Sequence, residues 1–166
     1  IMAEYEVAPA HMLKKIFAGL IRWMKDTRVK VKHSLDDIVD GIPRDVLALV
    51  LKIVINSIYG KFGFEKGDLY DRRAVLEVTI NGQLMLLMLC EQLDLNGLHI
   101  ISANTDGIMV KVYDKDISKY EYITQWWQEK TKMSADTDVV HCLIARDVNN
   151  YICQFRTKKG LKLEYK

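Results

Sequence analysis

Two amphipathic helical stretches separated by a short polar break constrain the fold of this chain more than any other feature. Apolar side chains recur with a helical period in residues 11–33 and again in residues 43–59. The break between them ends in Gly41-Ile42-Pro43, and proline is well placed at the first position of a helix. Because two helices joined by a short loop pack antiparallel, the sequence predicts a helical hairpin.

The rest of the chain alternates between helical and strand patterns. Residues 72–95 predict a third helix, which ends at Asn96-Gly97, a common left-handed helix stop. Residues 98–113 predict a β-hairpin with a tight turn at 104–107. We expect a further helix over 116–132 and strands near 139–147, 150–156 and 161–165. This order predicts an α+β fold, with a two-helix antiparallel hairpin followed by helices packed on an antiparallel sheet.

The composition is that of a globular chain with one core or two small lobes. Of the 166 residues, 49% are hydrophobic and 28% are charged, which excludes a disordered chain. The longest apolar run, Ile80–Cys90, is interrupted by polar residues and is too short to cross a bilayer, so we expect no membrane contact. Glu4 and Glu6 lie where a secretion signal would be basic. A start at Ile1 indicates a piece of a longer protein.

Positive charge is concentrated in two segments of the sequence. Residues 11–33 hold seven Lys and Arg side chains against Asp26 alone, and residues 156–166 hold five against Glu164. The remaining residues carry an excess of eight acidic side chains. This asymmetry is typical of contacts with a polyanion at chosen places, and also of ordinary solvated surface.

The segment from Lys52 to Gly60 places polar side chains on one face of an apolar helix. Lys52, Asn56 and Tyr59 fall at positions i, i+4 and i+7. A lysine, an amide and a phenol in one row can contact a phosphate, a sugar and a base. The same row can also be a polar stripe that faces solvent.

The turn Asn104-Thr105-Asp106-Gly107 presents a carboxylate at the tip of the predicted β-hairpin. Two strands hold such a carboxylate rigidly, as metal binding requires, and Mg²⁺ prefers carboxylate and carbonyl oxygens. Aspartate before glycine is also common in turns that bind nothing. The residues alone leave both interpretations open.

Arg28 and Lys32 form a basic pair at i, i+4 in the first helix. Like charges at this spacing repel weakly, by a few tenths of a kcal/mol at most. Solvent screens them on an exposed face, whereas beside a triphosphate they would form a clamp for its oxygens. In the predicted antiparallel hairpin, both residues approach Lys52.

The string Lys52-Ile-Val-Ile-Asn56-Ser-Ile-Tyr59-Gly60 resembles the Lys-x-x-x-Asn-Ser-x-Tyr-Gly motif of family B DNA polymerases at every fixed position. The resemblance implies that Lys52 contacts the incoming triphosphate. It also implies that Tyr59 and Gly60 shape the pocket of the nascent base pair, with Asn56 in the same nucleotide-binding set.

The pair Arg28 and Lys32 is similar to the Arg-x-x-x-Lys pair of the fingers in this family. The resemblance implies that both side chains hold the triphosphate. The run Ile1-Met2 resembles the segment just beyond the family's first palm motif. The first catalytic carboxylate is therefore expected upstream of Ile1.

The turn resembles the third palm motif of the same family, Tyr-x-Asp-Thr-Asp-Ser. The resemblance implies that Asp106 is catalytic and a metal ligand, with Asn104 and Thr105 also in the metal site, and that the complete enzyme uses two Mg²⁺ ions. Ala103, Asn104 and Gly107 depart from the usual residues. Asparagine keeps an oxygen but loses a charge, which weakens a metal contact there.

Residues near the end of the chain resemble the family's Lys-Lys-x-Tyr region, which touches the primer strand. Here Asn149-Asn150-Tyr151 has asparagine in place of both lysines. The resemblance implies DNA contacts by Asn150 and Tyr151, and Lys158 and Lys159 are expected at the DNA backbone. Tyr151 can equally pack in a sheet, and the two lysines can cap a turn.

The resemblance as a whole implies the fingers and palm of a phage-like DNA-directed DNA polymerase. We expect fingers in residues 1–60 and palm in residues 61–166, with the catalytic hairpin near 98–113. The implied partners are a DNA primer-template, a dNTP and the remainder of the polymerase, namely an upstream palm strand, an exonuclease and a thumb. One carboxylate cannot hold two metal ions, so the isolated fragment is expected to be inactive.

Cys90, Cys142 and Cys153 are odd in number and unclustered, which indicates reduced, buried thiols and a cytoplasmic protein. The resemblance adds a bacterial cytoplasm and a phage or mobile-element gene. Three other interpretations are open: a non-catalytic nucleic-acid-binding domain derived from a polymerase, a reverse transcriptase, and an unrelated helical domain with chance motifs.

Overall fold

The computed structural model describes residues 1–147, 150–157 and 160–165. The chain forms two compact units, Ile1–Gly82 and Gln83–Lys166, called here the first and the second unit. Helices and small antiparallel sheets make up both, which confirms the predicted α+β class. The boundary between the units falls within a helix, about twenty residues beyond the expected division between fingers and palm.

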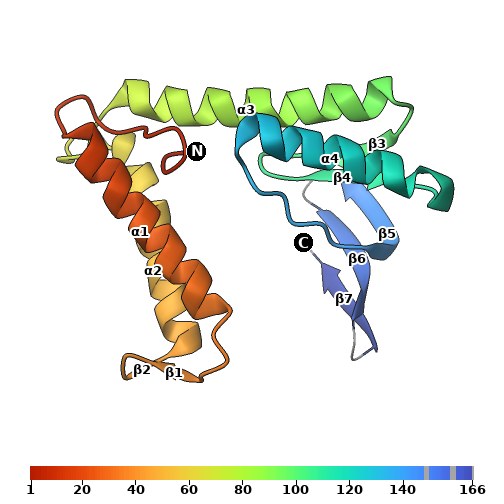
Figure 1. The fold of residues 1–166 in the computed structure, drawn as a ribbon, viewed down its shortest axis with the longest axis horizontal. Helices are drawn as coiled ribbons and strands as arrows, with labels where there is room; N and C mark the ends of the chain where they lie inside the picture. Colours follow the sequence, from red (N-terminus) through yellow and green to blue (C-terminus); the bar gives the residue numbers. More distant parts are fainter. Residues whose placement is uncertain (148–149, 158–159, 166) are drawn as a thin grey trace. The chain divides into compact units, whose positions relative to one another are not determined.

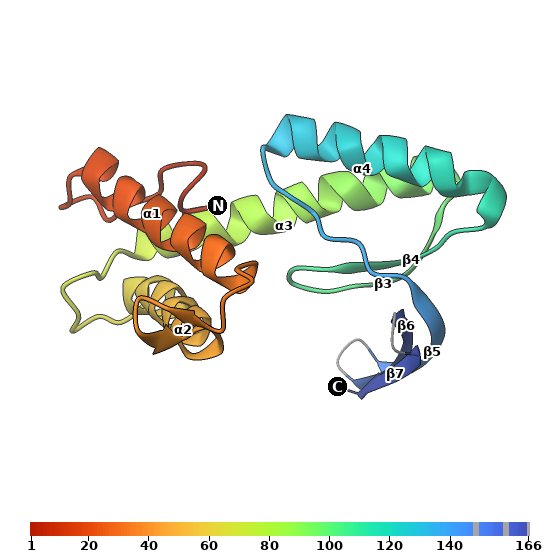
Figure 2. The same cartoon turned by 60° about the horizontal axis from the view of Figure 1, so that its bottom comes forward.

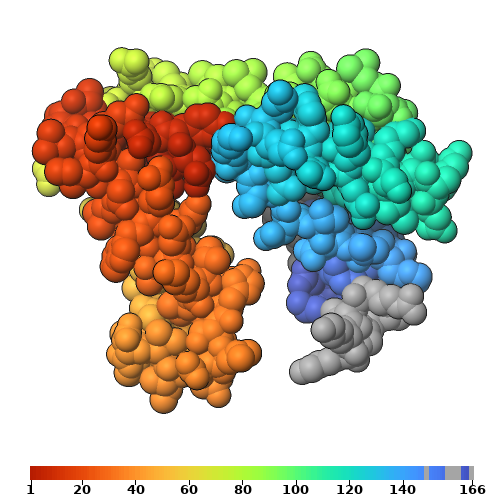
Figure 3. All heavy atoms as spheres, viewed as in Figure 1, coloured from red at the N-terminus to blue at the C-terminus, as the bar shows by residue number. Residues whose placement is uncertain are grey.

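The first unit is built on the predicted helical hairpin. Helices α1 (Lys14–Lys32) and α2 (Arg44–Phe62) lie side by side and antiparallel, as Figures 1 and 2 show. In the space-filling view, α1 presents its outer face as the red to orange lobe (Figure 3). Large apolar side chains of α1, such as Leu20 and Trp23, are exposed within the described residues.

A short β-hairpin closes the tip of the two helices, where the sequence analysis expected only a polar break. Strands β1 (Ile38–Val39) and β2 (Ile42–Pro43) pair antiparallel across Asp40 and Gly41. Both turn residues have positive φ, 53° and 78°. Two such residues in succession are typical of a type I′ turn, for which Asp-Gly is a favoured sequence. This dipeptide was an overlooked signal.

The core of the first unit lies at the base of the hairpin, around Phe62. This side chain has no exposed surface, and its ring centroid lies 5.8 Å from that of Phe17. Phe17, Ile21 and Met24 supply the buried stripe of α1, at the spacing of one helix face. Ala74 belongs to the same cluster, so the start of the next helix packs here too.

Asp71 ties the segment before α1 to the start of the third helix. Its carboxylate accepts hydrogen bonds from the backbone N–H of Ala10 at 2.7 Å and of Ala74 at 3.0 Å. These two donors lower the pKa of the Asp71 carboxyl, because they favour its charged form. Beside it, His11 Nε2 lies 2.7 Å from the carbonyl oxygen of Asp68. The base of the hairpin is thereby closed by polar contacts.

Helix α3 (Arg72–Leu95) has the predicted bounds and the predicted stop. Gly97 has φ 74°, and the N–H of Leu98 donates to the carbonyl oxygen of Leu93 at 2.9 Å. This bond and the left-handed glycine form a Schellman motif. Leu93 and Leu98 are both buried in one cluster, which is the apolar contact that often accompanies the motif.

The second unit packs α3 and a fourth helix over a β-hairpin. Strands β3 (His99–Ala103) and β4 (Ile108–Lys111) form that hairpin, and helix α4 (Ile117–Thr131) follows a short 3₁₀ turn at Asp114–Asp116. The indole Nε1 of Trp127 on α4 donates to the carbonyl oxygen of Met85 on α3 at 2.7 Å. Leu89, Leu93, Leu98, Ile123 and Trp127 make up the buried cluster.

The last three strands form a separate antiparallel sheet. The order is β5 (Val140–Asp147), β6 (Asn150–Thr157) and β7 (Gly160–Tyr165). The described strands of the second unit therefore make two small sheets, where the sequence pattern suggested one. The cysteines of the chain are free, with Cys153 buried and Cys90 half-buried. Cys142 is exposed on β5, so the expectation that all three thiols are buried is wrong for it.

Helix α3 is long and apolar enough to cross a membrane by length and composition alone. The apolar run Ile80–Cys90 is shorter than this helix, because the helix also includes polar residues on both sides of the run. Ala74 of α3 is buried in the cluster of the first unit, and Leu89 and Leu93 in that of the second. Only 11% of the apolar stretch of α3 is buried within the described part of the chain.

Replacement of Phe62 tests the core of the first unit. We expect Phe62→Ala to lower the free energy of unfolding by about 3–5 kcal/mol, because it empties a fully buried site. Phe64→Ala is the matched control, since Phe64 is 56% exposed, and we expect a loss of less than about 1 kcal/mol. Urea unfolding followed by circular dichroism measures both. Equal losses would contradict this account of the core.

Candidate functional site

The polar row on α2 lies beside the face that packs on α1. Lys52 and Asn56 are exposed, and Tyr59 is half-buried. The Tyr59 hydroxyl lies 2.8 Å from Thr79 Oγ1 on α3. Thr79 has one hydroxyl proton, and it donates that proton to the carbonyl oxygen of Val75, so Tyr59 is the donor in the pair. The phenol is therefore fixed while Lys52 and Asn56 reach solvent.

Gly60 is exposed on α2. A Cβ built on Gly60 would meet no atom within 4 Å beyond its chain neighbours and the backbone of its own helix. No contact inside the described part of the chain therefore requires glycine at this position. Its exposed surface is available to a bound molecule.

Arg28 occupies an unusual position for a charged side chain. It follows Phe17, Ile21 and Met24 on the buried stripe of α1, four residues beyond Met24. Its Nε atom is buried and has no hydrogen-bond partner among the described residues. Lys32, one turn further along, is exposed. Arg28 thus carries an unsatisfied donor within the helical hairpin.

The packing of the helical hairpin brings Arg28 and Lys52 to the same level along its axis. The Phe17–Phe62 ring contact marks the base. Counted from there, Arg28 lies roughly 16 Å along α1 and Lys52 roughly 15 Å along α2, at ~1.5 Å per residue. The antiparallel helices thus place at one level two cationic residues that are 24 positions apart in the sequence.

At the turn between β3 and β4, the Asn104 side chain is used in hydrogen bonds of the turn, and the Asp106 carboxylate is exposed. The Oδ1 atom of Asn104 accepts the backbone N–H of Gly107 at 2.9 Å and that of Asp106 at 3.3 Å. The backbone N–H of Asn104 donates to the carbonyl oxygen of Gly107 at 2.9 Å. Asp106 and Thr105 are exposed at the tip. Both lone pairs of the Asn104 oxygen are used within the turn, whereas the Asp106 carboxylate is available.

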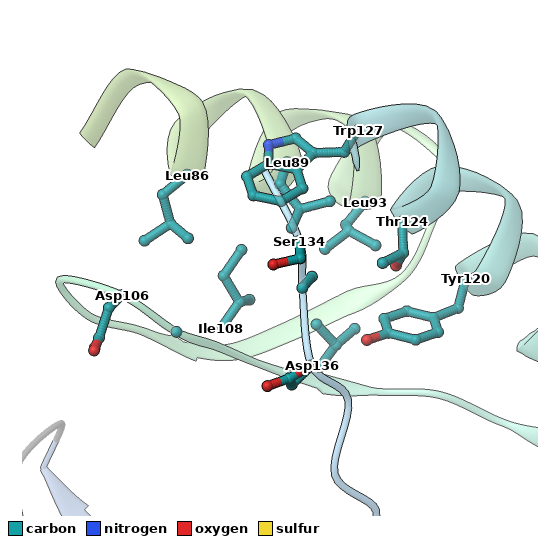
Figure 4. A pocket seen from close by; sticks show the side chains of 13 residues that line it. Leu86, Leu89, Leu93, Asp106, Ile108, Tyr120, Thr124, Trp127, Ser134 and Asp136 are labelled. Carbon is teal, nitrogen blue, oxygen red and sulfur yellow. The ribbon is translucent and has the colours of Figure 1, made fainter. Parts of the chain in front are cut away.

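Asp106 also lines a cavity of about 350 Å³ within the second unit. Figure 4 shows Asp106 at one end of the cavity and Asp136 on the segment that follows α4. Among the residues that the structure describes, no group of three or more acidic, His or Cys side chains is close enough to hold a metal ion. The described residues offer one free carboxylate at the turn.

The structure describes two of the four residues expected to contact DNA. Asn150 begins β6, and its Nδ2 atom donates to both carboxylate oxygens of Asp147, at 2.9 and 2.8 Å. Tyr151 is half-buried and pairs with Ala145 on β5. Lys158 and Lys159 lie outside the described residues. Asn150 therefore also has a structural role at the β5–β6 turn.

Comparison with known proteins identifies the family. The model of DNA polymerase family B matches residues 3–135, which include both the Lys52–Gly60 string and the Asn104–Gly107 turn. The chain belongs to DNA polymerase family B. This membership excludes a reverse transcriptase and an unrelated helical domain. The phage-like branch stays a prediction.

Two curated relatives are DNA polymerases of archaea. The DNA polymerase of Thermococcus sp. (strain 9oN-7) is 29% identical over 123 residues, which are 68% of this chain and 16% of the relative. DNA polymerase 1 of Aeropyrum pernix is 31% identical over 109 residues, 63% of this chain and 11% of the relative. The chain thus spans about one sixth or less of the length of these relatives.

A solved structure shares the fold. The family B DNA polymerase from the hyperthermophilic archaeon Pyrobaculum calidifontis superimposes with a TM-score of 0.60. The match covers 92% of this chain and 19% of that one, at 17% sequence identity. The fold therefore extends beyond residue 135, into the region that the family model does not match.

The sequence analysis missed three polar residues next to the expected ones. Thr79 holds the Tyr59 hydroxyl from another helix, and Thr124 and Asp136 line the cavity that contains Asp106. The helical period places Thr79 one turn after Val75. No local pattern indicates that it meets a tyrosine twenty residues earlier.

Replacement of Asn104 tests its role in the turn. We expect Asn104→Ala to speed amide exchange at Gly107 about five- to tenfold, because the variant loses an acceptor worth about 1 kcal/mol. Asn104→Asp keeps the acceptor and is expected to keep slow exchange. Thr105→Ala, also at the exposed tip, is the matched control. Hydrogen exchange by NMR measures all three, and unchanged exchange in Asn104→Ala would refute the role.

Proposed function

We propose that this chain supplies the fingers and the catalytic part of the palm of a DNA-directed DNA polymerase. The enzyme would add dNTPs to the 3′-hydroxyl of a DNA primer paired with a template. The family match carries the proposal, because it covers the lysine-bearing helix and the aspartate-bearing turn in one stretch, residues 3–135. In this proposal the fingers comprise residues 1–60 and the palm residues 61–166.

The cationic residues of the first unit would bind the triphosphate of the incoming nucleotide. Arg28 and Lys52 lie at one level of the hairpin, and Lys32 is one turn nearer its tip. The buried, unpartnered Nε of Arg28 supports this role, because a phosphate oxygen would satisfy it. A guanidinium and two ammonium groups together carry three positive charges, which would offset most of the negative charge of a triphosphate.

Tyr59 and Gly60, at the C-terminal end of the polar row on α2, would border the nascent base pair. Tyr59 is held by Thr79, so its ring presents a fixed surface. Gly60 is exposed on the same helix, so a bound molecule could approach its backbone closely. Asn56, exposed between Lys52 and Tyr59, would contact the sugar. Closure of the fingers would bring these groups onto a correctly paired nucleotide and exclude water from it.

Asp106 would hold Mg²⁺ in the complete enzyme. Its exposed carboxylate is a hard oxygen donor, as Mg²⁺ requires, and Thr105 lies next to it. Asn104 would act by keeping the turn closed, since its oxygen already accepts two N–H groups. The chemistry supplied by two bound Mg²⁺ ions is activation of the primer hydroxyl and neutralisation of the pyrophosphate. The second essential carboxylate would come from the remainder of the polymerase.

The other partners follow from the same proposal. Asn150 and Tyr151 would lie along the primer strand, with Lys158 and Lys159 at the DNA backbone. The remainder of the polymerase would comprise the upstream palm strand, an exonuclease and a thumb. We further propose a bacterial cytoplasm as the location, with a phage or mobile-element gene, and no membrane partner.

Nucleotide binding by the isolated chain tests the role of Lys52. We expect Lys52→Ala to weaken dATP binding about tenfold or more, because a charge-assisted hydrogen bond contributes roughly 1.5–3 kcal/mol. Lys61→Ala on the same helix is the charge-matched control and should change little. Isothermal titration calorimetry with dATP and dAMP measures the effect. Equal losses for the two variants would indicate only general charge attraction.

Primer extension tests the role of Asp106. We expect extension by the isolated chain to stay at background, since it offers one free carboxylate at the turn. A longer protein that adds the preceding segment should extend the primer. In that protein Asp106→Ala should lower the rate at least about a hundredfold, because even the loss of an outer-shell partner costs 10–100-fold. An inactive longer protein that still binds DNA would instead indicate a non-catalytic binding domain.

A further inference from the structure

The cavity of the second unit lies between α3, α4, the β3–β4 hairpin and the segment that follows α4 (Figure 4). Its volume of about 350 Å³ falls at the lower end of the range for small-molecule sites, roughly 300–1,000 Å³. One part of the wall is aliphatic, and the side chains involved are Leu86, Leu89, Leu93, Ile108 and Val110. A ligand here needs a small apolar body.

Thr124 contributes an unsatisfied hydroxyl to this cavity. The residue is 8% exposed, and its Oγ1 atom is buried without a hydrogen-bond partner in the described part of the chain. Two other helical threonines differ: Thr79 and Thr131 each donate to the carbonyl oxygen four residues earlier, at 2.8 Å. In Figure 4 the Thr124 side chain points from α4 toward the β3–β4 hairpin. A buried hydroxyl without a partner is costly, and a polar ligand group would remove that cost.

The charged side chains among the described lining residues of the cavity are all acidic. Asp106 and Asp136 both line the cavity, and no Lys, Arg or His is among the described residues that do so. The two carboxylates come from different elements, the β3–β4 turn and the segment after α4 (Figure 4). Tyr120 and Trp127 add aromatic surface, which favours organic cations. The indole N–H of Trp127 is already used, since it donates to Met85.

We propose that this cavity binds a small organic amine, in which a protonated amino group is joined to a compact apolar body. The aliphatic walls would cover the body, the aspartates would attract the ammonium, and one N–H would donate to Thr124 Oγ1. That oxygen has no exposed surface, so the ligand reaches it after the Thr124 side chain turns about its Cα–Cβ bond. A neutral apolar molecule would leave the charge unmatched, and an anion would be repelled. The proposal does not depend on polymerase activity.

Three ligands with one carbon skeleton test the chemistry of the site. We expect 2-phenylethylamine to bind the full chain about tenfold more tightly than 2-phenylethanol, as a charged donor near carboxylates predicts, and phenylacetate not to bind. NMR titration gives the affinities and identifies the amides that shift. Equal binding of amine and alcohol, or no binding of the amine, would overturn the proposal. So would Mg²⁺ alone shifting the same signals while the amine does not.

Two variants locate the binding site within the chain. Thr124→Val keeps the side-chain shape and removes the hydroxyl, so it should weaken amine binding about fivefold without lowering the melting temperature. Asp136→Asn should weaken the amine and leave the alcohol unchanged. Asp138→Asn is the matched control, because Asp138 is exposed on the same segment and does not line the cavity. If neither Thr124→Val nor Asp136→Asn weakens the amine more than this control does, the site is not this cavity.

Discussion

The ring contact between Phe17 and Phe62 determines how the two helices of the first unit lie against one another. Phe62 has no exposed surface, so a sliding of α1 along α2 would open a cavity at the base of the hairpin. The same contact sets which residues share a level along the axis. It brings Arg28 to the level of Lys52, and the proposed triphosphate site is in this sense a consequence of core packing.

The β3–β4 turn shows how a departure from the family pattern can preserve structure while it changes charge. The family motif that this turn resembles has aspartate at the position of Asn104. An aspartate carboxylate and an asparagine amide oxygen can accept the same N–H groups, here those of Asp106 and Gly107. The turn keeps its acceptor, and the site loses one negative charge. In the proposed metal site, affinity would therefore depend more heavily on Asp106 and on the carboxylate proposed to come from the remainder of the polymerase.

Local signals were sufficient to predict most helices and strands. The helical period and Gly97 gave α3 its bounds, and the alternation around Asn104–Gly107 gave the β3–β4 hairpin. The β1–β2 hairpin was missed although Asp40-Gly41 encodes its turn. Contacts between distant residues had no such signal: the Tyr59–Thr79 hydrogen bond joins two helices, and the exposure of Cys142 depends on how β5 packs. Periodicity in the sequence indicates which face of a helix or strand is apolar. Tertiary packing determines which residues cover that face.

Asp106 belongs to two candidate sites at once, the proposed metal site and the cavity of the second unit. One carboxylate cannot neutralise two cations fully, so a bound amine and a bound Mg²⁺ would each weaken the other. Thermodynamic linkage makes this effect reciprocal: the factor by which the amine lowers metal affinity equals the factor by which the metal lowers amine affinity. Thr124 and Asp136 line the cavity and are not among the proposed metal ligands, so their replacement would change amine binding and leave Asp106 in place. The two sites can therefore be separated by mutation although they share a carboxylate.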